Sequence, residues 1–228
     1  VERRQTVKMR QTKNTVSAKR PIKLAIALSL VIILVAACAL RIYSVNNLSQ
    51  QKPSVSYSIS EDMPILNSAG SDVYARVLNY CVLSKDEALS AFPDCQSELD
   101  ILGPDTETKI LIVRVVFFNK SSNEQMVEPA CLKAQAGAWA NGMDVRLFCK
   151  INNVAGMAGR LAAGRSVEML VPYVASDNQF GFSREWDTFE NASFNLVTAT
   201  YPQKTYIQLS NKLAFEVFSF SANVGEGE

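Results

Sequence analysis

The sequence predicts an all-β domain, an antiparallel immunoglobulin-like β-sandwich, joined to one N-terminal transmembrane helix. Short segments rich in β-forming residues recur at a spacing of 10–20 residues, and only one segment of the domain has helical character. This spacing is typical of sandwiches built from antiparallel strands. A run of seventeen residues without a charge, Leu24–Leu40, predicts the helix.

The strands of the predicted sandwich follow from runs of apolar or alternating residues. Ile110–Phe118 (ILIVRVVFF) is the most apolar run of the domain and predicts a central strand. Pro172 has no N–H to donate, so its strand is expected at an edge or a bulge. Lys85–Phe92 is the one predicted helix, with Ser84 as N-cap and Pro93 ending it. We expect strands over residues 55–59, 72–84, 110–118, 125–134, 143–151, 167–174, 193–201, 204–210 and 213–220.

The apolar run Leu24–Leu40 has the length and flanks of a membrane anchor. With Ile22, Ile42 and Tyr43 it reaches the roughly 20 residues that a bilayer core requires. Residues 1–23 carry eight basic side chains and one acidic one, which by the positive-inside rule predicts a cytoplasmic N-terminus. The expected protein is therefore a single-pass plasma-membrane protein with an extracellular C-terminal domain. Its parts are a basic tail (1–21), a transmembrane helix (22–43), a stalk (44–54), the sandwich (55–222) and a polar tail (223–228).

A lipoprotein signal is the alternative anchor. Val35-Ala36-Ala37-Cys38 fits the pattern in which the chain is cut before a cysteine that becomes lipidated, so Cys38 is a candidate lipidation site. Against this interpretation, the apolar run continues through Leu40 into Arg41 instead of a small polar tether. Both interpretations place the domain outside the cell.

Charge and composition exclude several classes of function. Residues 42–228 hold 14 basic and 21 acidic side chains, a net charge of −7 that disfavours nucleic acid as a partner. The chain contains no histidine, which excludes a Ser-His-Asp triad, a Cys-His pair and a histidine-based zinc site. We therefore expect no cofactor, no metal and no enzymatic activity.

Four cysteines of the predicted domain are candidates for two disulfides: Cys81, Cys95, Cys131 and Cys149. An even number in an exported domain is typical of a disulfide framework, with three possible connectivities. Cys81–Cys95 and Cys131–Cys149 are the favoured pairs, the second across a hairpin whose turn includes Asn141-Gly142. Reduced cysteines packed in the core are the alternative.

Acidic residues occur in two clusters in the predicted loops. Two opposed carboxylates perform glycoside hydrolysis in many enzymes, and a loop cluster can hold Ca²⁺. Neither cluster has the D-x-D-x-D-G spacing of a calcium loop, so solvated loop charge is favoured over either site. A lipoprotein-anchored extracellular hydrolase with paired carboxylates is the alternative function. The clusters are Asp94, Glu98, Asp100, Asp105 and Glu107, and Asp177, Glu185, Asp187 and Glu190.

The segment 180–186 (FGFSREW) is a candidate recognition loop. Aromatic residues and arginine are common at binding surfaces, which points to Phe180, Phe182, Arg184 and Trp186. In the alternative interpretation, Phe182 and Trp186 cover the open end of the sandwich. The expected function is a membrane-anchored, non-catalytic extracellular module for binding or cell-envelope interaction. Its expected partners are the lipid bilayer and an envelope protein or glycan.

Residues 110–210 carry a pattern that resembles a known group of proteins. A V-x-V-x-x-x-N strand end at Val113–Asn119 comes before a leucine-to-glycine turn, Leu161…Gly164. That turn enters the strand VEMLVPY, and a later pair of strands flanks Tyr201-Pro202. The pattern resembles the uncharacterised immunoglobulin-like ectodomains that Gram-positive bacteria tether by one N-terminal helix or lipid. The resemblance implies a sandwich fold at the cell surface and brings no catalytic residues.

Overall fold

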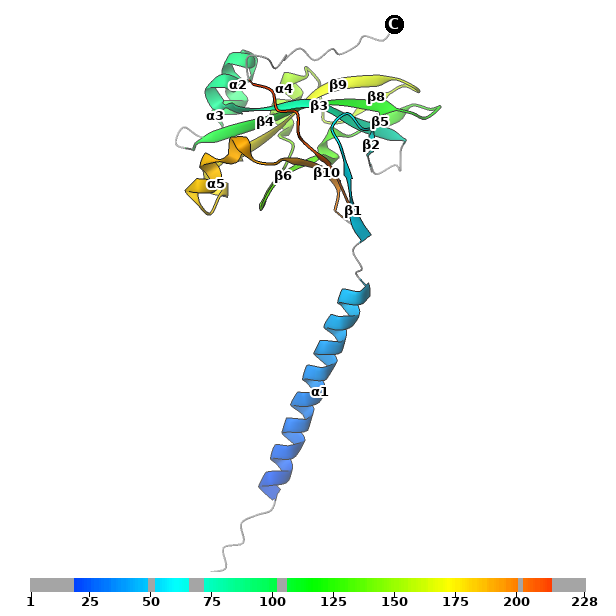
Figure 1. Ribbon diagram of the computed structural model, residues 1–228, viewed down its shortest axis with the longest axis vertical. Coiled ribbons are helices and arrows are strands. Elements are labelled where there is room, and N and C mark those ends of the chain that lie inside the picture. The colour runs from blue at the N-terminus through cyan, green and yellow to red at the C-terminus, as the bar shows by residue number, and fades with distance from the viewer. Residues whose placement is uncertain (1–18, 49–51, 66–71, 102–105, 201–202, 215–228) are drawn as a thin grey trace, which may run out of the picture. The chain divides into compact units, whose positions relative to one another are not determined.

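The computed structural model describes residues 19–48, 52–65, 72–101, 106–200 and 203–214 (Figure 1). The chain divides into two units, residues 1–50 and 51–228. The first contains the helix α1 (Lys19–Leu48), in which large apolar side chains such as Ile33 and Leu40 are more than half exposed. In the described part of the chain, no helix meets the length and hydropathy needed to cross a membrane.

The described residues of the second unit form mainly β-strands, in two larger sheets and one small one. The strand orders are β1-β11-β10-β6-β7, β2-β3-β4-β9 and β5-β8. Strand β1 pairs with β11 in parallel, and the other pairs are antiparallel, which confirms a predominantly antiparallel β domain. The strands are β1 (Lys52–Tyr57), β2 (Met63–Pro64), β3 (Val73–Ser84), β4 (Thr108–Asn119), β5 (Gln125–Val127), β6 (Lys133–Ala136), β7 (Trp139–Gly142), β8 (Gly159–Leu161), β9 (Ser166–Ser176), β10 (Asn195–Ala199) and β11 (Gln203–Gln208).

The prediction of a central strand over Ile110–Phe118 is confirmed. Strand β4 lies between β3 and β9, in register with β3 at Val77↔Val115. Its inward side chains join residues of both sheets, such as Tyr173 and Leu196, in the main core cluster. Because Ile110 and Ile112 are buried on the opposite face, this strand is apolar on both sides, which explains its unbroken run of apolar residues.

Short helices form a second core on the outer face of the four-stranded sheet. They are α2 (Lys85–Ala91), α3 (Gln96–Asp100) and α4 (Val145–Ile151). The helix α5 (Ser183–Asp187) packs instead with the aromatic residues of the main core. The predicted helix α2 is confirmed, and it begins in a capping box of Ser84 and Glu87. The described residues also form four 3₁₀ turns: η1 (Pro93–Cys95), η2 (Pro129–Cys131), η3 (Asp177–Gln179) and η4 (Phe189–Asn191).

The strand predicted over residues 143–151 is wrong, because this segment forms the helix α4. The Asp144 side chain accepts a hydrogen bond from the N–H of Leu147 at 3.0 Å and caps the helix. Leu147 and Phe148 are both buried although they are adjacent, whereas Val145 is 40% exposed. Successive side chains of a helix are about 100° apart around its axis, so Leu147 and Phe148 can both be buried while Val145 stays at the surface.

The predicted hairpin turn at Asn141-Gly142 is also wrong. Strands β6 and β7 turn through Gly137 and Ala138, with Ala136 paired to Trp139. Gly137 has φ +57°, the left-handed conformation that such two-residue turns require. The strand predicted over 125–134 is interrupted by η2 at Pro129, and residues 215–220 of the last predicted strand lie outside the described residues.

Pro172 lies on an edge strand, as predicted. Strand β9 ends the four-stranded sheet, and its outer edge faces α4 and β7. The Asn152 side chain donates to the carbonyl of Leu170 at 2.8 Å and accepts from its N–H at 2.9 Å. The carbonyl of Pro172 accepts from the N–H of Asp144 at 2.9 Å. These bonds give the outward-facing backbone groups of Leu170 and Pro172 hydrogen-bond partners, and they fix α4 against the sheet.

Asn119 joins the two parts of the sequence pattern noted at Val113–Asn119 and at Leu161…Gly164. Its buried side-chain amide donates to the carbonyls of Leu161 at 2.8 Å and Ala162 at 3.1 Å. The turn continues through Gly164, whose φ of +69° favours glycine. The V-x-V-x-x-x-N strand end and the leucine-to-glycine turn are therefore two sides of one hydrogen-bonded corner.

Candidate functional site

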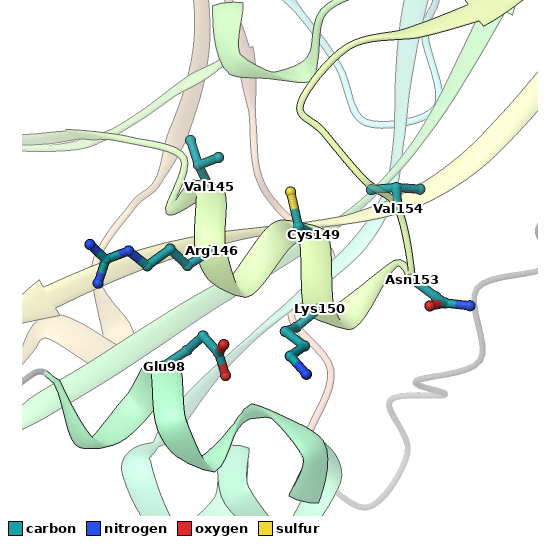
Figure 2. Close-up of a pocket in the computed structure, with 7 residues that line it drawn as sticks. All are labelled: Glu98, Val145, Arg146, Cys149, Lys150, Asn153 and Val154. Carbon is teal, nitrogen blue, oxygen red and sulfur yellow. The ribbon is translucent and has the colours of Figure 1, made fainter.

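An open pocket of about 460 Å³ lies between α3 and α4 (Figure 2). One wall comes from α3, the other from α4 and from the turn that follows it. Its lining residues are Glu98, Val145, Arg146, Cys149, Lys150, Asn153 and Val154.

The end of α4 gives the pocket its apolar wall. Asn153 has φ +51°, its N–H donates to the carbonyl of Lys150, and the N–H of Val154 donates to the carbonyl of Cys149. These two bonds form a Schellman motif, which commonly brings the residue after the helix against its last turn. Val154 and Cys149 therefore line the same pocket, together with Val145.

The opposite charges of the pocket face one another without direct pairing. Arg146 and Lys150 are one turn apart on α4, and Figure 2 shows Glu98 pointing from α3 toward that helix. Among the described residues, no ion pair joins Glu98 to either cation. The pKa of Glu98 is lowered, first by a hydrogen bond from Ser97 and further by the charges of Lys150 and Arg146. The pocket thus presents two cations and one carboxylate.

Trp186, from the predicted recognition loop, is buried in the core. Its indole N–H donates to Glu107 Oε2 at 2.7 Å, and its ring stacks on Phe189 with centroids 6.0 Å apart. Lys109 Nζ lies 4.7 Å from the centroid of the Trp186 ring and donates to the Trp186 carbonyl at 3.1 Å. The side chain therefore makes its contacts within the domain.

The other members of the predicted loop differ in exposure. Phe180 is half-buried against Trp186 and Phe189, whereas Phe182 is 72% exposed and Arg184 is exposed as well. Of the two residues expected to cover the open end, Trp186 is thus buried and Phe182 is not.

A second, smaller pocket of about 190 Å³ lies beside this aromatic cluster. The β6–β7 turn supplies one side, and α5 with the turn η4 supplies another. Trp139 is fixed there by a hydrogen bond from its indole N–H to Gln179 Oε1 at 3.0 Å. The lining residues are Ala136, Gly137, Ala138, Trp139, Phe180, Glu185, Thr188, Phe189 and Ala192.

The clustered acids are distributed over different contacts. Glu107 accepts the indole N–H of Trp186, Glu190 pairs with Lys109 at 3.3 Å, and Asp100 pairs with Lys85 at 3.5 Å. Asp105 lies outside the described residues. In the part of the chain that the structure describes, no group of three acidic or thiol side chains is placed to hold a metal ion.

The five cysteines are free in the structure, so neither predicted disulfide is formed in it. Cys81 and Cys95 are buried together in the second core, where burial raises their pKa to about 12 and about 11. Burial also raises the pKa of Cys131 to about 12, and Cys149 lines the α3–α4 pocket. Cys38 is exposed on α1.

The α3–α4 pocket has no local signature in the sequence. Glu98 is far from Arg146 along the chain, and only the fold brings them together. The four-residue spacing of Arg146 and Lys150 would have placed both on one face of a helix. That signal is lost when the segment is taken for a strand.

No curated protein matches this chain. The solved structures similar to it include a functionally unknown protein from Listeria monocytogenes EGD-e, with a TM-score of 0.40 and 7% identity over 68% of this chain and 85% of that chain. The yjhA protein from Bacillus subtilis has a TM-score of 0.39 and 12% identity, over 68% of this chain and 99% of its own. An uncharacterised β-sandwich protein from Clostridium difficile 630 has a TM-score of 0.36 and 8% identity, over 71% of this chain and 99% of its own. A family described as "Domain of unknown function (DUF5028)" matches residues 55–205, which is more than half of the sequence, and the chain belongs to that family.

Proposed function

We propose that the protein is a non-catalytic binding module, tethered outside the plasma membrane by its N-terminal helix, with the α3–α4 pocket as its ligand site. One observation carries the proposal: Glu98, Arg146 and Lys150 line an open pocket of about 460 Å³ without an ion pair between them among the described residues. Small-molecule sites typically have volumes of about 300–1,000 Å³. The immunoglobulin-like form of the sandwich is part of the same proposal.

The tether is supported by α1 and by the charges before it. Large apolar side chains along this helix are 57–69% exposed, which favours an apolar surrounding over water. The eight basic residues among residues 1–23 favour a cytoplasmic N-terminus and an external domain. Lipidation of Cys38 is the alternative form of the same tether.

The charges of the pocket define the class of ligand. Two cations and one carboxylate complement a small molecule with two carboxylates and one ammonium group. Arg146 offers a planar fork for one carboxylate, while Lys150 offers a compact charge for the other. Val145, Cys149 and Val154 provide apolar contact for the carbons between these groups. The ligand class is therefore that of an acidic amino acid.

The absence of histidine and the roles of the acids support binding without catalysis. No side chain of this sequence has the ordinary pKa of a general base near neutral pH. Glu107 and Glu190 already have partners in Trp186 and Lys109.

The ligand site is tested by calorimetric titration of the full chain, in maltoside detergent, with L-glutamate. We expect glutamate to bind and glutarate, which lacks the ammonium group, to bind more weakly. Arg146→Gln and Lys150→Gln should each weaken glutamate binding on the order of tenfold or more, because each removes a charge-assisted hydrogen bond. Lys133→Gln, an exposed lysine of β6 outside the pocket, is the matched control and should leave the affinity unchanged. Equal losses in Lys133→Gln and Lys150→Gln, or no binding of glutamate, would contradict the ligand assignment.

The topology is tested separately with protease added to intact cells that express the full chain. Residues 52–214 should become accessible from outside while residues 1–23 stay protected. Protection of both segments until the cells are lysed would contradict an external domain.

A further inference from the structure

We infer that the small pocket beside the β6–β7 turn, at the end of the domain where Trp139, Phe180, Trp186 and Phe189 cluster (the aromatic end), is a second binding site. This site takes a small alkylammonium group. It shares no lining residue with the α3–α4 pocket, so this inference stands on separate observations. Its volume of about 190 Å³ is below the range of typical small-molecule sites. The pocket therefore fits one headgroup, with the remainder of the ligand outside.

The walls of the pocket combine aromatic rings with small residues. Trp139, Phe180 and Phe189 pack edge to face, with Trp139–Phe189 centroids 5.0 Å apart and Phe180–Phe189 centroids 5.4 Å apart. The opposite side is the turn through Gly137, which has no side chain, and Ala138. This composition leaves room beside the rings instead of filling it.

Glu185 gives the pocket its charge preference. The carboxylate is exposed and lines the same pocket as the three rings. Glu185 forms no ion pair with any cation of the described residues. Aromatic faces carry partial negative charge and attract cations, quaternary ammonium groups included. Rings and carboxylate together favour a cation over a neutral group of the same shape.

The same aromatic cluster already binds a cation of the domain in this way. The Lys109 ammonium lies over the Trp186 ring, with the Glu190 carboxylate 3.3 Å from it. Ring, carboxylate and ammonium therefore occur together within the cluster. The pocket beside Glu185 offers the ring and the carboxylate, and we assign the ammonium to the ligand.

Two probes of equal shape test the inference. Choline and its uncharged analogue 3,3-dimethyl-1-butanol are titrated into the full chain in maltoside, and binding is followed by calorimetry and tryptophan fluorescence. Choline should bind on the order of tenfold more tightly than the analogue, because only choline gains from the rings and the carboxylate. Glu185→Gln should reduce this preference to about twofold or less. Asp187→Asn, an exposed acid of the same helix outside the pocket, should preserve it.

A second variant occludes the pocket without removing charge. Ala138 is exposed at the turn, so Ala138→Phe should leave the fold intact and abolish choline binding. Equal affinity for choline and the analogue, unchanged binding in Ala138→Phe, or equal effects of Glu185→Gln and Asp187→Asn would each overturn the inference. So would a failure of the wild-type chain to bind choline.

Discussion

The α3–α4 pocket and the pocket beside the β6–β7 turn are built from opposite kinds of residues. The aromatic end contains the loop that composition marks for recognition, yet Trp186 makes its contacts with Phe189, Glu107 and Lys109 of its own chain. The α3–α4 pocket contains the ordinary surface charges of Glu98, Arg146 and Lys150. Among the described residues, none of these three forms an ion pair with another. Residue type alone therefore does not identify a binding group. What matters is whether the fold has already satisfied that group.

The largest effect on stability is expected from substitutions in α5 and at its N-cap residue, Phe182. Trp186→Ala should lower the free energy of unfolding by about 3–5 kcal/mol, because it empties a buried aromatic site. Phe182→Ala, four residues earlier and 72% exposed, should change it by less than about 0.5 kcal/mol. Urea unfolding of the full chain measures both values. Similar losses in the two variants would mean that the aromatic end does not divide into packed and free residues.

The support of the charged pocket is tested at Asn152. Asn152→Ala should cost about 2–4 kcal/mol, because it leaves the N–H and carbonyl of Leu170 unpaired at a buried edge. Helix α4 should also lose protection from amide hydrogen exchange before the sheet does. If exchange in α4 stays unchanged, Asn152 does not hold the pocket wall in place.

The buried thiols predict a loss of stability at high pH. The pKa of Cys81 is raised from 9.0 to about 12 by burial, so the folded state favours the neutral thiol. The contribution of this thiol to the free energy of unfolding is complete below pH 9 and is lost as the pH rises from 9 toward 12. Cys131, Tyr80 and Tyr173 shift in the same direction.

Unfolding measured between pH 8 and 11 tests the thiol prediction, and Cys81→Ala should reduce the slope. An identical slope in Cys81→Ala would contradict it. Mass spectrometry of the non-reduced chain, which would reveal a Cys81–Cys95 bridge, is the control.

The smallest effect is expected at Asn153. Because its φ is +51°, Asn153→Gly should be neutral or stabilise the chain by up to about 1 kcal/mol. Asn153→Ala should destabilise it by about 1 kcal/mol, since alanine tolerates this conformation poorly. Thermal unfolding separates the two variants. A greater loss for glycine than for alanine would show that the Schellman end of α4 is not what positions Val154.

The parts of the fold that are encoded locally were predictable from the sequence. Three features depend only on residues of one segment: the apolar run of β4, the proline of the edge strand β9 and the Ser84 cap of α2. Each could therefore be recognised without knowing the rest of the fold. The helix α4 was not predictable in this way. Val145, Leu147, Cys149 and Ile151 alternate like a strand, and the decisive contacts of Asn152 come from β9.

The candidate site was less predictable than the fold. The loop 180–186 was identified by composition, but the burial of Trp186 depends on Glu107 and Lys109, which lie far away in sequence. The disulfide pairs were inferred from an even count of cysteines, while the structure buries Cys81 and Cys95 as free thiols. Each of these outcomes depends on contacts between distant segments, which composition does not reveal.

The central claim, that the α3–α4 pocket binds a small acidic amino acid, is tested most directly at Cys149. This thiol lines the pocket, whereas Cys81 and Cys95 are buried elsewhere. The rate of Cys149 alkylation by iodoacetamide, followed by mass spectrometry of the full chain, should fall as L-glutamate is added and saturate with the calorimetric affinity. In Lys150→Gln the same fall in rate should require glutamate concentrations on the order of tenfold higher or more, in line with its weaker binding. A Cys149 rate that is independent of glutamate in the wild-type chain would contradict the claim.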